Sequence, residues 1–191
     1  WESGLAVPIP LHTGFETSGR RIVGTTLDYF DFRGLAVAEG RGLALLGEAV
    51  VGAEAARALG VAPGETLVST PATLFDLGGA YPLEMPVVGV LAPTGTPDDG
   101  AVFVDLRTAW IIAGIGHGHD DAVPRGAPAI DTARRITPET AESFHFHGDP
   151  DTFPVTAAIV VPHDVRAATI LRGRYLDPET RAQLVRPAEV M

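Results

Sequence analysis

Glycine and proline punctuate this chain so densely that it must fold from short elements. The 191 residues include 22 Gly and 16 Pro, which leave only short apolar runs between them. Proline lacks a backbone N–H and glycine loses much conformational freedom on folding, so both interrupt regular elements. A fold of short strands and short helices is therefore expected.

The apolar runs are in turn strand-like and helix-like. The predicted strands are 20–27, 48–51, 65–69, 86–92, 101–104 and 155–161. The predicted helices are 53–59, about 105–115 and about 163–174, the last with Val165, Ala168, Ile170 and Leu171 available for burial. Gly60 stands where a C-terminal glycine cap is expected. The short strands are too many for a clean doubly wound sheet, so the pattern favours an α+β fold with two subdomains.

Other segments have no clear period. Residues 28–32 predict an aromatic turn, interpreted as core packing with a partner-docking patch as the alternative. Residues 70–85 predict an irregular loop or hairpin tip, and residues 116–150 predict an insertion that holds four of the six histidines. Residues 180–186 fit either a helix, started by Asp177 and Pro178, or a strand.

Composition narrows the classes of partner. The formal net charge is −10 and all 14 basic residues are arginine, so nucleic acid is not expected as a partner. The chain has no cysteine, which excludes disulfides and thiolate metal sites. No stretch approaches the roughly 20 apolar residues of a membrane span, and no signal peptide is evident. Because the chain starts at Trp1, we expect that flanking segments are missing.

Catalytic motifs are not evident. A phosphate-binding P-loop needs a lysine, which the chain lacks, and the four serines do not form a Gly-x-Ser-x-Gly elbow. The chain is therefore expected not to be an enzyme. An enzyme of unrecognised type remains the alternative, and a pocket that gathers carboxylates and histidine would support it.

Histidine forms the one suggestive constellation of metal ligands. His117 and His119 form one His-x-His pair, and His145 and His147 form a second, each followed by acidic residues. In an extended segment, residues i and i+2 project to the same side, so each pair can present two imidazoles to one cation. Two such pairs brought together would suit Zn, Ni or Cu. The alternative is a solvated loop that binds metal only opportunistically.

A stiff polar loop is predicted at residues 93–100. Its first part, Pro93, Thr94, Gly95, Thr96 and Pro97, is a candidate contact point that relays motion to a neighbouring part of the protein. The alternative is that these prolines and glycines only satisfy turn geometry.

The order of these segments resembles the MacB/FtsX-type permeases of ABC transporters. Residues 21–30, RIVGTTLDYF, look like the family's V-G-T/V-x-x-x-Y-F segment, and 39–41, EGR, match its x-G-R step. Residues 48–60, EAVVGAEAARALG, resemble its A-V-L-G-x-x-V-A-x-x-L-G strand and helix, and 64–67, GETL, its following strand. Residues 87–97, VVGVLAPTGTP, resemble a run of one permease branch, with 101–106 as the next strand. The likeness covers about residues 20–110, and more faintly 155–191.

The resemblance implies the periplasmic core domain between the first two transmembrane helices of a permease. Such a domain has a mixed sheet with helices and a smaller inserted subdomain, here placed at about 33–92, with 1–32 and 93–191 forming the other subdomain. The chain departs from the family at 116–150, which has no firm counterpart, and at Asp98-Asp99-Gly100, where a basic residue is expected nearby.

The function implied by the resemblance is mechanical. The domain would lie on the periplasmic, extracytoplasmic side of the cytoplasmic membrane and relay the motion driven by a separate cytoplasmic ABC ATPase subunit. Its other implied partners are a second permease subunit, as homodimer or heterodimer, and a periplasmic binding protein or lipoprotein. The full-length gene is then expected to encode about four membrane spans, one before Trp1 and three after Met191. The runner-up function is a Zn-binding or Zn-delivering module; no other cofactor is expected.

Overall fold

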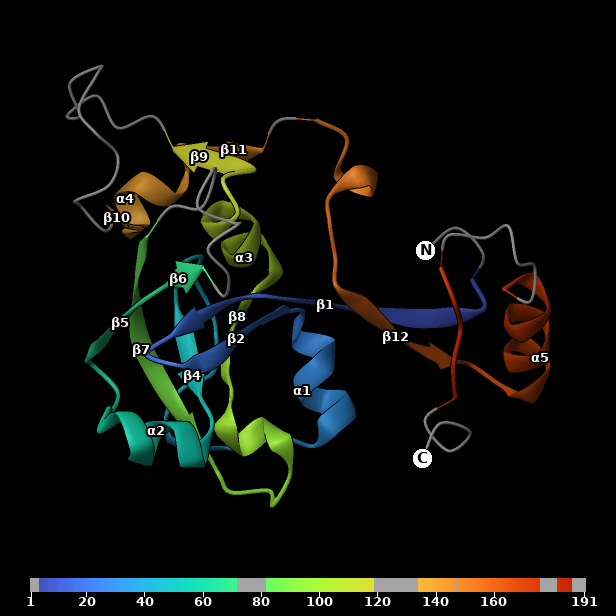
Figure 1. Ribbon diagram of the computed structural model, residues 1–191, viewed down its shortest axis with the longest axis horizontal. Coiled ribbons are helices and arrows are strands. Elements are labelled where there is room, and N and C mark those ends of the chain that lie inside the picture. Colours follow the sequence, from blue (N-terminus) through green and yellow to red (C-terminus); the bar gives the residue numbers. More distant parts are fainter. Residues whose placement is uncertain (1–3, 72–81, 119–133, 147, 176–181, 187–191) are drawn as a thin grey trace. The chain divides into compact units, whose positions relative to one another are not determined.

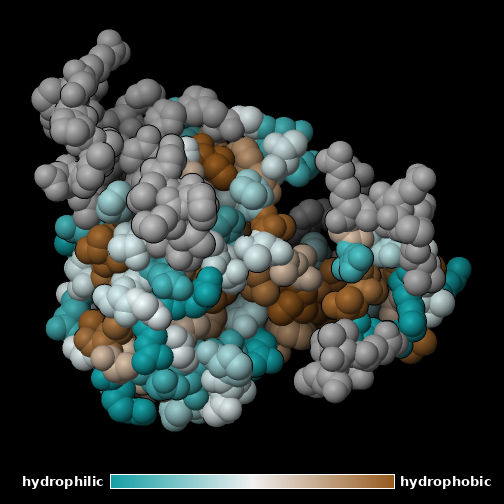
Figure 2. All heavy atoms as spheres, viewed as in Figure 1, coloured by the Kyte–Doolittle hydropathy of each residue, from teal (hydrophilic) through white to brown (hydrophobic). Residues whose placement is uncertain are grey.

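The fold was derived from a computed structural model, which describes residues 4–71, 82–118, 134–146, 148–175 and 182–186. The contacts between residues divide the chain into two compact units. Unit 1 comprises Trp1–Ile9 and Ala158–Met191, and unit 2 comprises Pro10–Ala157. Figure 1 shows the elements of both units, and Figure 2 shows hydrophilic and hydrophobic residues interspersed over the described surface in the same view.

The elements are short, as the glycine and proline content predicts. The strands are β1 (Ala6–Thr17), β2 (Arg20–Thr25), β3 (Val37–Gly40), β4 (Ala49–Val51), β5 (Thr66–Val68), β6 (Thr70–Pro71), β7 (Leu83–Leu91), β8 (Val102–Asp105), β9 (Gly116–Gly118), β10 (Arg134–Arg135), β11 (Phe144–Phe146) and β12 (Ala157–Pro162). The α-helices are α1 (Leu27–Arg33), α2 (Ala53–Leu59), α3 (Leu106–Ile112), α4 (Pro138–Ala141) and α5 (Val165–Arg174). The described residues also form the 3-10 turns η2 (Pro97–Gly100) and η3 (Pro150–Thr152).

A mixed sheet forms the centre of unit 2. Its strands follow the order β10-β7-β4-β8-β2-β1, with β3 and β5 also paired to β7. The pairs β2–β8, β4–β7 and β10–β7 are parallel, whereas β1–β2 and β4–β8 are antiparallel. The predicted α+β class with a mixed sheet is therefore confirmed.

Strand β8 contributes to the core on both faces of this sheet. Val102 and Val104 belong to the same buried cluster as Ala109 of α3 and Ala55 of α2. Phe103 is also fully buried, but its ring packs against the rings of Tyr29 and Phe30, with centroids 5.7 and 5.5 Å away. Because successive side chains of a strand project to opposite faces, β8 is covered on both sides.

Helix α1 corrects the prediction for residues 28–32. The segment is helical from Leu27 to Arg33 rather than an aromatic turn, and Gly34 ends it in the left-handed conformation with φ 64°. Tyr29 is buried, as the core-packing interpretation expects, but Phe32 is 48% exposed. An isolated aromatic run reads as a turn because aromatic residues have only modest helix propensity, and here tertiary packing decides the conformation.

Helix α2 lies where the sequence predicts it. It spans Ala53–Leu59, and Gly60 caps it with φ 67°, donating its N–H to the carbonyl of Ala56. At the other end, the N–H of Gly52 donates to the Ala101 carbonyl before β8. The start of helix α2 is thereby tied to the start of β8.

The part of residues 116–150 that the structure describes contains short elements of its own. Strands β9 and β11 form a separate two-stranded ribbon, and α4 begins with a capping box between Thr137 and Thr140. Phe146 and Phe153 lie with their ring centroids 6.2 and 5.1 Å from that of Trp110 on α3, and the Trp110 indole N–H donates to the Pro154 carbonyl at 2.8 Å. These contacts hold Phe146, Phe153 and Pro154 against α3.

Unit 1 contains the start of β1, together with β12 and α5. Asp164 caps α5 by accepting a hydrogen bond from the Ala167 N–H at 2.6 Å. Leu171 is buried as expected, but Val165 and Ile170 are 84% and 38% exposed, so the predicted burial of those two side chains is wrong. Ala167 is buried in their place, because residues 167 and 171 share one face at the helical spacing of four.

Several predictions on boundaries have different outcomes. Residues 182–186 form neither helix nor strand, and most of the predicted loop at 70–85 lies outside the described residues. Within the predicted inserted subdomain at 33–92, β4 pairs with β8, which lies in the other predicted subdomain. The division at 33 and 92 stays a prediction.

Candidate functional site

The predicted relay loop connects β7 to β8 and is held in shape by its own side chains. Pro93, Thr94, Gly95 and Thr96 lead into the 3-10 turn η2, which starts at Pro97. Gly95 has a φ of 71°, a conformation that side-chain-bearing residues rarely adopt. The Thr96 hydroxyl caps the turn by accepting a hydrogen bond from the Asp98 N–H at 3.4 Å.

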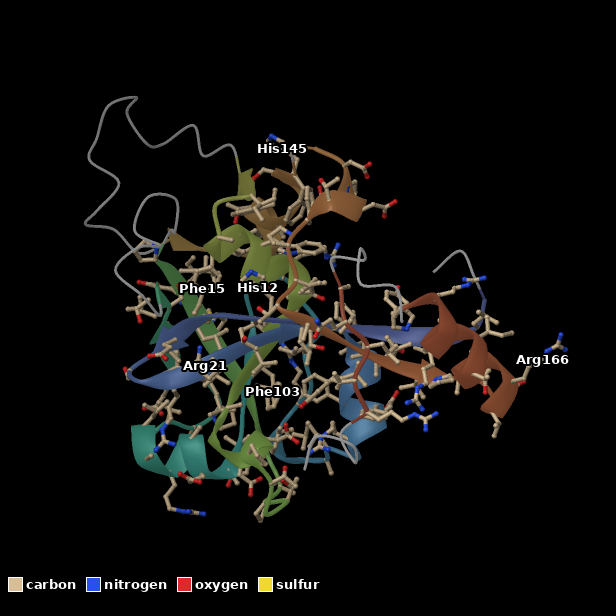
Figure 3. All side chains as sticks on the ribbon, turned by 45° about the vertical axis from the view of Figure 1, so that its right-hand side comes forward. His12, Phe15, Arg21, Phe103, His145 and Arg166 are labelled. Carbon is tan, nitrogen blue, oxygen red and sulfur yellow. The ribbon has the colours of Figure 1, made fainter. Side chains whose placement is uncertain are left out.

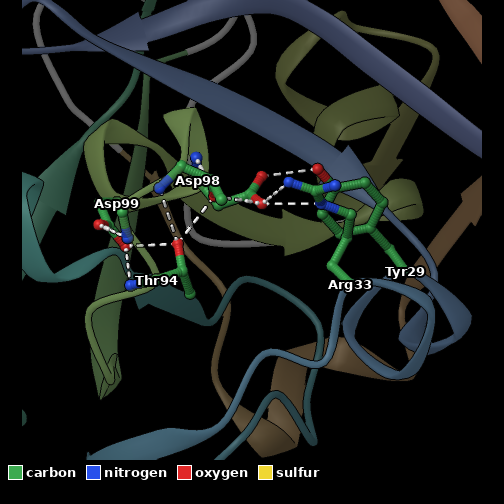
Figure 4. Close-up of polar contacts among 7 residues, drawn as sticks. Tyr29, Arg33, Thr94, Asp98 and Asp99 are labelled. Carbon is green, nitrogen blue, oxygen red and sulfur yellow. Dashed lines mark hydrogen bonds and ion pairs between the residues drawn. The ribbon is translucent and has the colours of Figure 1, made fainter. Parts of the chain in front are cut away.

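Asp99 closes the loop from its exposed side (Figure 4). Its carboxylate accepts hydrogen bonds from the N–H and the hydroxyl of Thr94 and from the N–H of Gly95, each at 2.8 Å. The hydrogen bond from the backbone N–H of Thr94 is the main cause that lowers the pKa of Asp99. The loop is therefore stapled by an ionised carboxylate to its own backbone.

Asp98 joins the same loop to helix α1. This carboxylate is only 7% exposed and accepts hydrogen bonds from the Tyr29 hydroxyl at 2.7 Å and from the Arg33 Nε at 2.9 Å. The Arg33 Nη2 lies 2.8 Å from the same oxygen as Nε, Oδ2. The Thr96 hydroxyl donates to it as well, at 3.0 Å. Figure 4 shows Tyr29 and Arg33 approaching Asp98 together from α1.

The electrostatics of this network keep its charges fixed. Burial, followed by the hydrogen bond and the charge of Asp98, raises the pKa of Tyr29 to about 12. The hydrogen bond to Asp98 also raises the pKa of Arg33. Tyr29 is therefore a neutral donor and Arg33 a cation at every physiological pH.

Helix α2 approaches the loop from another direction. A side chain at Gly52, the residue before α2, would place its Cβ 2.3 Å from the Asp98 carbonyl oxygen and 2.6 Å from that of Asp99. Only glycine allows this approach of two backbones. The loop is thus bonded to α1 by side chains and fitted against α2 by backbone. This arrangement can hold the loop and the two helices together.

Sequence reasoning singled out the loop but missed its anchors. Asp98 and Asp99 stand out in the sequence only as departures from the family pattern, and Arg33 carries no local signal. Tyr29 and Arg33 are four residues apart, so in a helix they lie on the same face about one turn apart. The prediction of a turn at 28–32 hid that signal.

The four predicted metal ligands are described only in part. Strands β9 and β11 pair antiparallel with His117 directly opposite His145 in the register. His119 and His147 lie outside the described residues. No group of three or more histidines, cysteines, aspartates or glutamates that could hold a metal occurs within the described part of the chain. The structure thus pairs one histidine from each His-x-His motif, and the four-ligand site stays a prediction.

His12 lies apart from this ribbon, as Figure 3 shows. Its ring stacks on Phe15 of the same strand with centroids 5.3 Å apart, and burial lowers its pKa. His12 therefore packs as a neutral, half-buried side chain.

Comparison with known proteins gives one family. The model of the MacB-like periplasmic core domain matches residues 6–123. No curated protein matches. None of the helices in the described residues has the length and apolar character needed to cross a membrane.

Three solved structures share features with this chain. The periplasmic region of MacB from Actinobacillus actinomycetemcomitans is 17% identical with a TM-score of 0.38, over 55% of this chain and 50% of that one. The extracellular domain of the noncanonic ABC-type transporter YknZ from Gram-positive bacteria is 16% identical with a TM-score of 0.38, over 55% and 56%. A domain described as part of a permease protein from Porphyromonas gingivalis is 13% identical with a TM-score of 0.40, over 92% and 66%. The chain thus spans between half and two thirds of the lengths of these structures.

Proposed function

Because the chain belongs to the family of MacB-like periplasmic core domains, we propose that it is the extracytoplasmic, non-catalytic domain of an ABC transporter permease. In this proposal the domain relays the motion driven by a cytoplasmic ABC ATPase subunit and contacts the substrate or a partner protein. The permease would act as a homodimer or heterodimer, and a periplasmic binding protein or lipoprotein is the expected external partner. As part of the same proposal, the run APTGTP at residues 92–97 resembles that of one permease branch, to which the chain would belong.

The observation that carries the relay proposal is the double anchoring of the loop at residues 93–97. A segment transmits displacement only if it is stiff, and the stiffness here comes from hydrogen bonds within the loop and from the loop to α1. Asp99 holds the loop to itself through three hydrogen bonds, while Asp98 holds it to Tyr29 and Arg33 of α1. Charge-assisted bonds of this kind are about twice as strong as neutral ones. In this proposal a displacement of α1 is transmitted to the loop through the hydrogen bonds of Asp98.

The test uses the full-length permease with its ATPase, reconstituted in lipid vesicles. The variant Asp98→Asn, Asp99→Asn removes both charges while keeping both side-chain shapes. We expect transport to fall several-fold while ATP hydrolysis persists, because the power stroke would no longer reach the external domain intact. The matched control is Asp31→Asn, an exposed carboxylate on α1.

A direct readout of motion accompanies the transport assay. The chain has no cysteine, so the exposed Ala38 of β3 can be changed to Cys and spin-labelled without background from this domain. ATP should change the distance between labels in the two subunits, and the double variant should blunt that change. Unchanged label distances with and without ATP, in a permease that transports, would contradict the relay.

A metal-binding module is the second candidate, and the β9–β11 register is the observation that favours it. Directly opposite residues of an antiparallel pair have Cα atoms about 4.5–5.5 Å apart, a spacing that suits two ligands of one ion. His117 and His145 occupy such positions, and each is the first histidine of its His-x-His motif. Zn²⁺ bound by imidazole would need further ligands, which the motifs supply in His119 and His147.

Calorimetry with Zn²⁺ tests this second candidate. The variant with His117, His119, His145 and His147 all changed to Ala should lose the binding heat of the unaltered chain. The matched control, His163→Ala, removes an exposed histidine that lies outside both motifs and should bind Zn²⁺ as before. Equal heats in the fourfold variant and the control would remove the metal site from consideration.

A further inference from the structure

A cavity of about 490 Å³ lies in unit 2 and shares no residue with the loop at residues 93–97. It is bounded by the segment 41–48, by β7 and by the residues from β10 to α4, which Figure 1 shows at one end of β7. Its wall is largely apolar, with side chains of Leu45, Leu46, Pro86, Val88, Ile136 and Ala141. Cavities of roughly 300–1,000 Å³ with apolar walls and a few polar groups are typical of small-molecule sites.

Strand β7 explains why this wall is open to a ligand. Its odd-numbered side chains, such as Met85 and Val87, are fully buried in the core, whereas Pro86 and Val88 are half-buried on the opposite face. Pro86 has no N–H to offer a neighbouring strand, and on the edge of β7 that carries β10 the pairing with β10 ends after Leu83 and Glu84. The cavity covers this interruption.

Two arginines, Arg41 and Arg135, contribute to the lining of the cavity. They differ in whether a carboxylate of the described residues already pairs with the guanidinium. Arg41 donates through both terminal nitrogens to the carboxylate of Glu48, which also accepts from the N–H groups of Ala44 and Leu45 at 3.0 Å each. The two charges cancel, and the Glu48 carboxylate has its acceptor positions occupied. This pair fixes the shape of the cavity rather than drawing a ligand.

Arg135 has a different environment. It is exposed at the end of β10, and among the residues that the structure describes its guanidinium forms no hydrogen bond or ion pair. Its register partner Glu84 lies on β7, yet the two side chains do not meet in an ion pair within the described residues. Within the described residues, Arg135 is therefore a cation at the cavity that no carboxylate pairs with, in a chain of net charge −10.

We propose that this cavity binds a small amphipathic anion, such as a medium-chain fatty acid. The aliphatic body lies against the apolar wall, where burial of its methylene groups favours binding. The carboxylate binds the guanidinium of Arg135, whose planar fork matches a carboxylate in two parallel hydrogen bonds. The inference is independent of the relay proposal, since it concerns other residues and a different measurement.

Fluorescence titration of the 191-residue chain tests this site with a matched pair of probes. Anilinonaphthalene sulfonate is an apolar anion, and N-phenylnaphthylamine is its uncharged counterpart. We expect both to bind, decanoate to displace both, and Arg135→Gln to weaken the anion about tenfold while changing the uncharged probe less than about twofold. Arg107→Gln removes an exposed arginine on α3 and serves as the control that should change neither.

A second variant and a mapping experiment keep the outcome decisive. Ala141→Trp fills the cavity and should abolish the binding of both probes. In methyl-resolved NMR of the unaltered chain, decanoate should shift the signals of Leu45, Leu46 and Ile136 and leave those of Val102 and Val104 in place. Equal affinity of Arg135→Gln for the anion, or shifts outside these three residues only, would overturn the proposal.

Discussion

Two carboxylates, Asp98 and Glu48, are buried in the part of the chain that the structure describes, and each is paired with an arginine. A buried charge is tolerated only when it is paired and its remaining acceptor positions are hydrogen-bonded. Arginine meets this requirement better than lysine, because its planar group donates several hydrogen bonds in fixed directions. The absence of lysine from this chain therefore does not weaken its internal ion pairs.

Removing the charge of Asp98 should destabilise the fold measurably. Asp98→Asn leaves Arg33 without its anion and presents an amide where Tyr29 and Arg33 need acceptors. We expect the free energy of unfolding to fall by roughly 1–3 kcal/mol in urea titrations. The control Asp31→Asn, on the exposed side of α1, should change it by less than about 0.5 kcal/mol.

The Tyr29 hydroxyl supplies a spectroscopic check on the same network. Its pKa is raised to about 12, so it should ionise later than an ordinary tyrosine when absorbance at 295 nm is followed to high pH. The late component should disappear in Tyr29→Phe. Because the unfolded chain releases this proton near pH 10 and the folded chain near pH 12, the network's contribution to stability is complete below about pH 10 and declines above it. An unchanged late component in Tyr29→Phe would assign it to another tyrosine.

At the scale of elements, α2 shows what the sequence can predict and β1 shows what it cannot. Helix α2 combines strong helix formers with Gly52 and Gly60 at its ends, so local signals and the fold agree. Strand β1 was missed because Pro8 and Pro10 argue against a strand, although prolines are tolerated where the N–H is not needed by a neighbour. Helix α1 was mistaken for a turn because its stability comes from contacts with Phe103, which lies more than seventy residues later.

The candidate site shows the same division. The loop at 93–97 could be found from its prolines and glycines, because turn chemistry is local. Its anchors could not, since the contacts from Asp98 to Tyr29 and Arg33 join residues 69 and 65 positions apart in sequence. The cavity beside Arg135 left no local signal either, because its wall is assembled from three separate segments.

The contact between α2 and the loop should depend on Gly52 having no side chain. Gly52→Ala places a methyl group within 2.6 Å of two backbone oxygens, so the helix or the loop must shift. We expect a loss of roughly 1–3 kcal/mol in the free energy of unfolding, the range seen for overpacked sites. Gly42→Ala is the matched control, since nothing lies within 4 Å of its added carbon. Comparable losses in both variants would mean that backbone freedom, not crowding, matters at Gly52.

At the scale of the whole molecule, the family match and the compact unit have different ends. The match stops at residue 123, whereas unit 2 continues to Ala157. The additional residues include Ile136, which belongs to the buried core, and Phe146 and Phe153, which pack on Trp110. The described residues from 134 to 157 are therefore part of the same compact unit as most of the family match.

Fragments test where the folding unit ends. The fragment 10–157 should unfold in one cooperative transition, because it retains the core and the aromatic contacts on α3. The fragment 6–123 matches the family model but lacks Ile136, Phe146 and Phe153, so its thermal midpoint should be lower or its transition broad. Thermal unfolding followed by circular dichroism compares them directly. A sharp transition of equal midpoint for the shorter fragment would show that the residues after 123 contribute nothing to the stability of the fold.

Strand β8 has hydrogen-bonded neighbours at both edges, β4 and β2, and buried side chains on both faces. Water can reach its backbone only after both neighbours have separated from it. Amide protons at Val102, Phe103 and Val104 should consequently be the last to take up deuterium, with rates set by global unfolding rather than by local opening. The exchange rates of β8 would then give the rate of global unfolding, with which faster exchange in the neighbouring loop and helices can be compared.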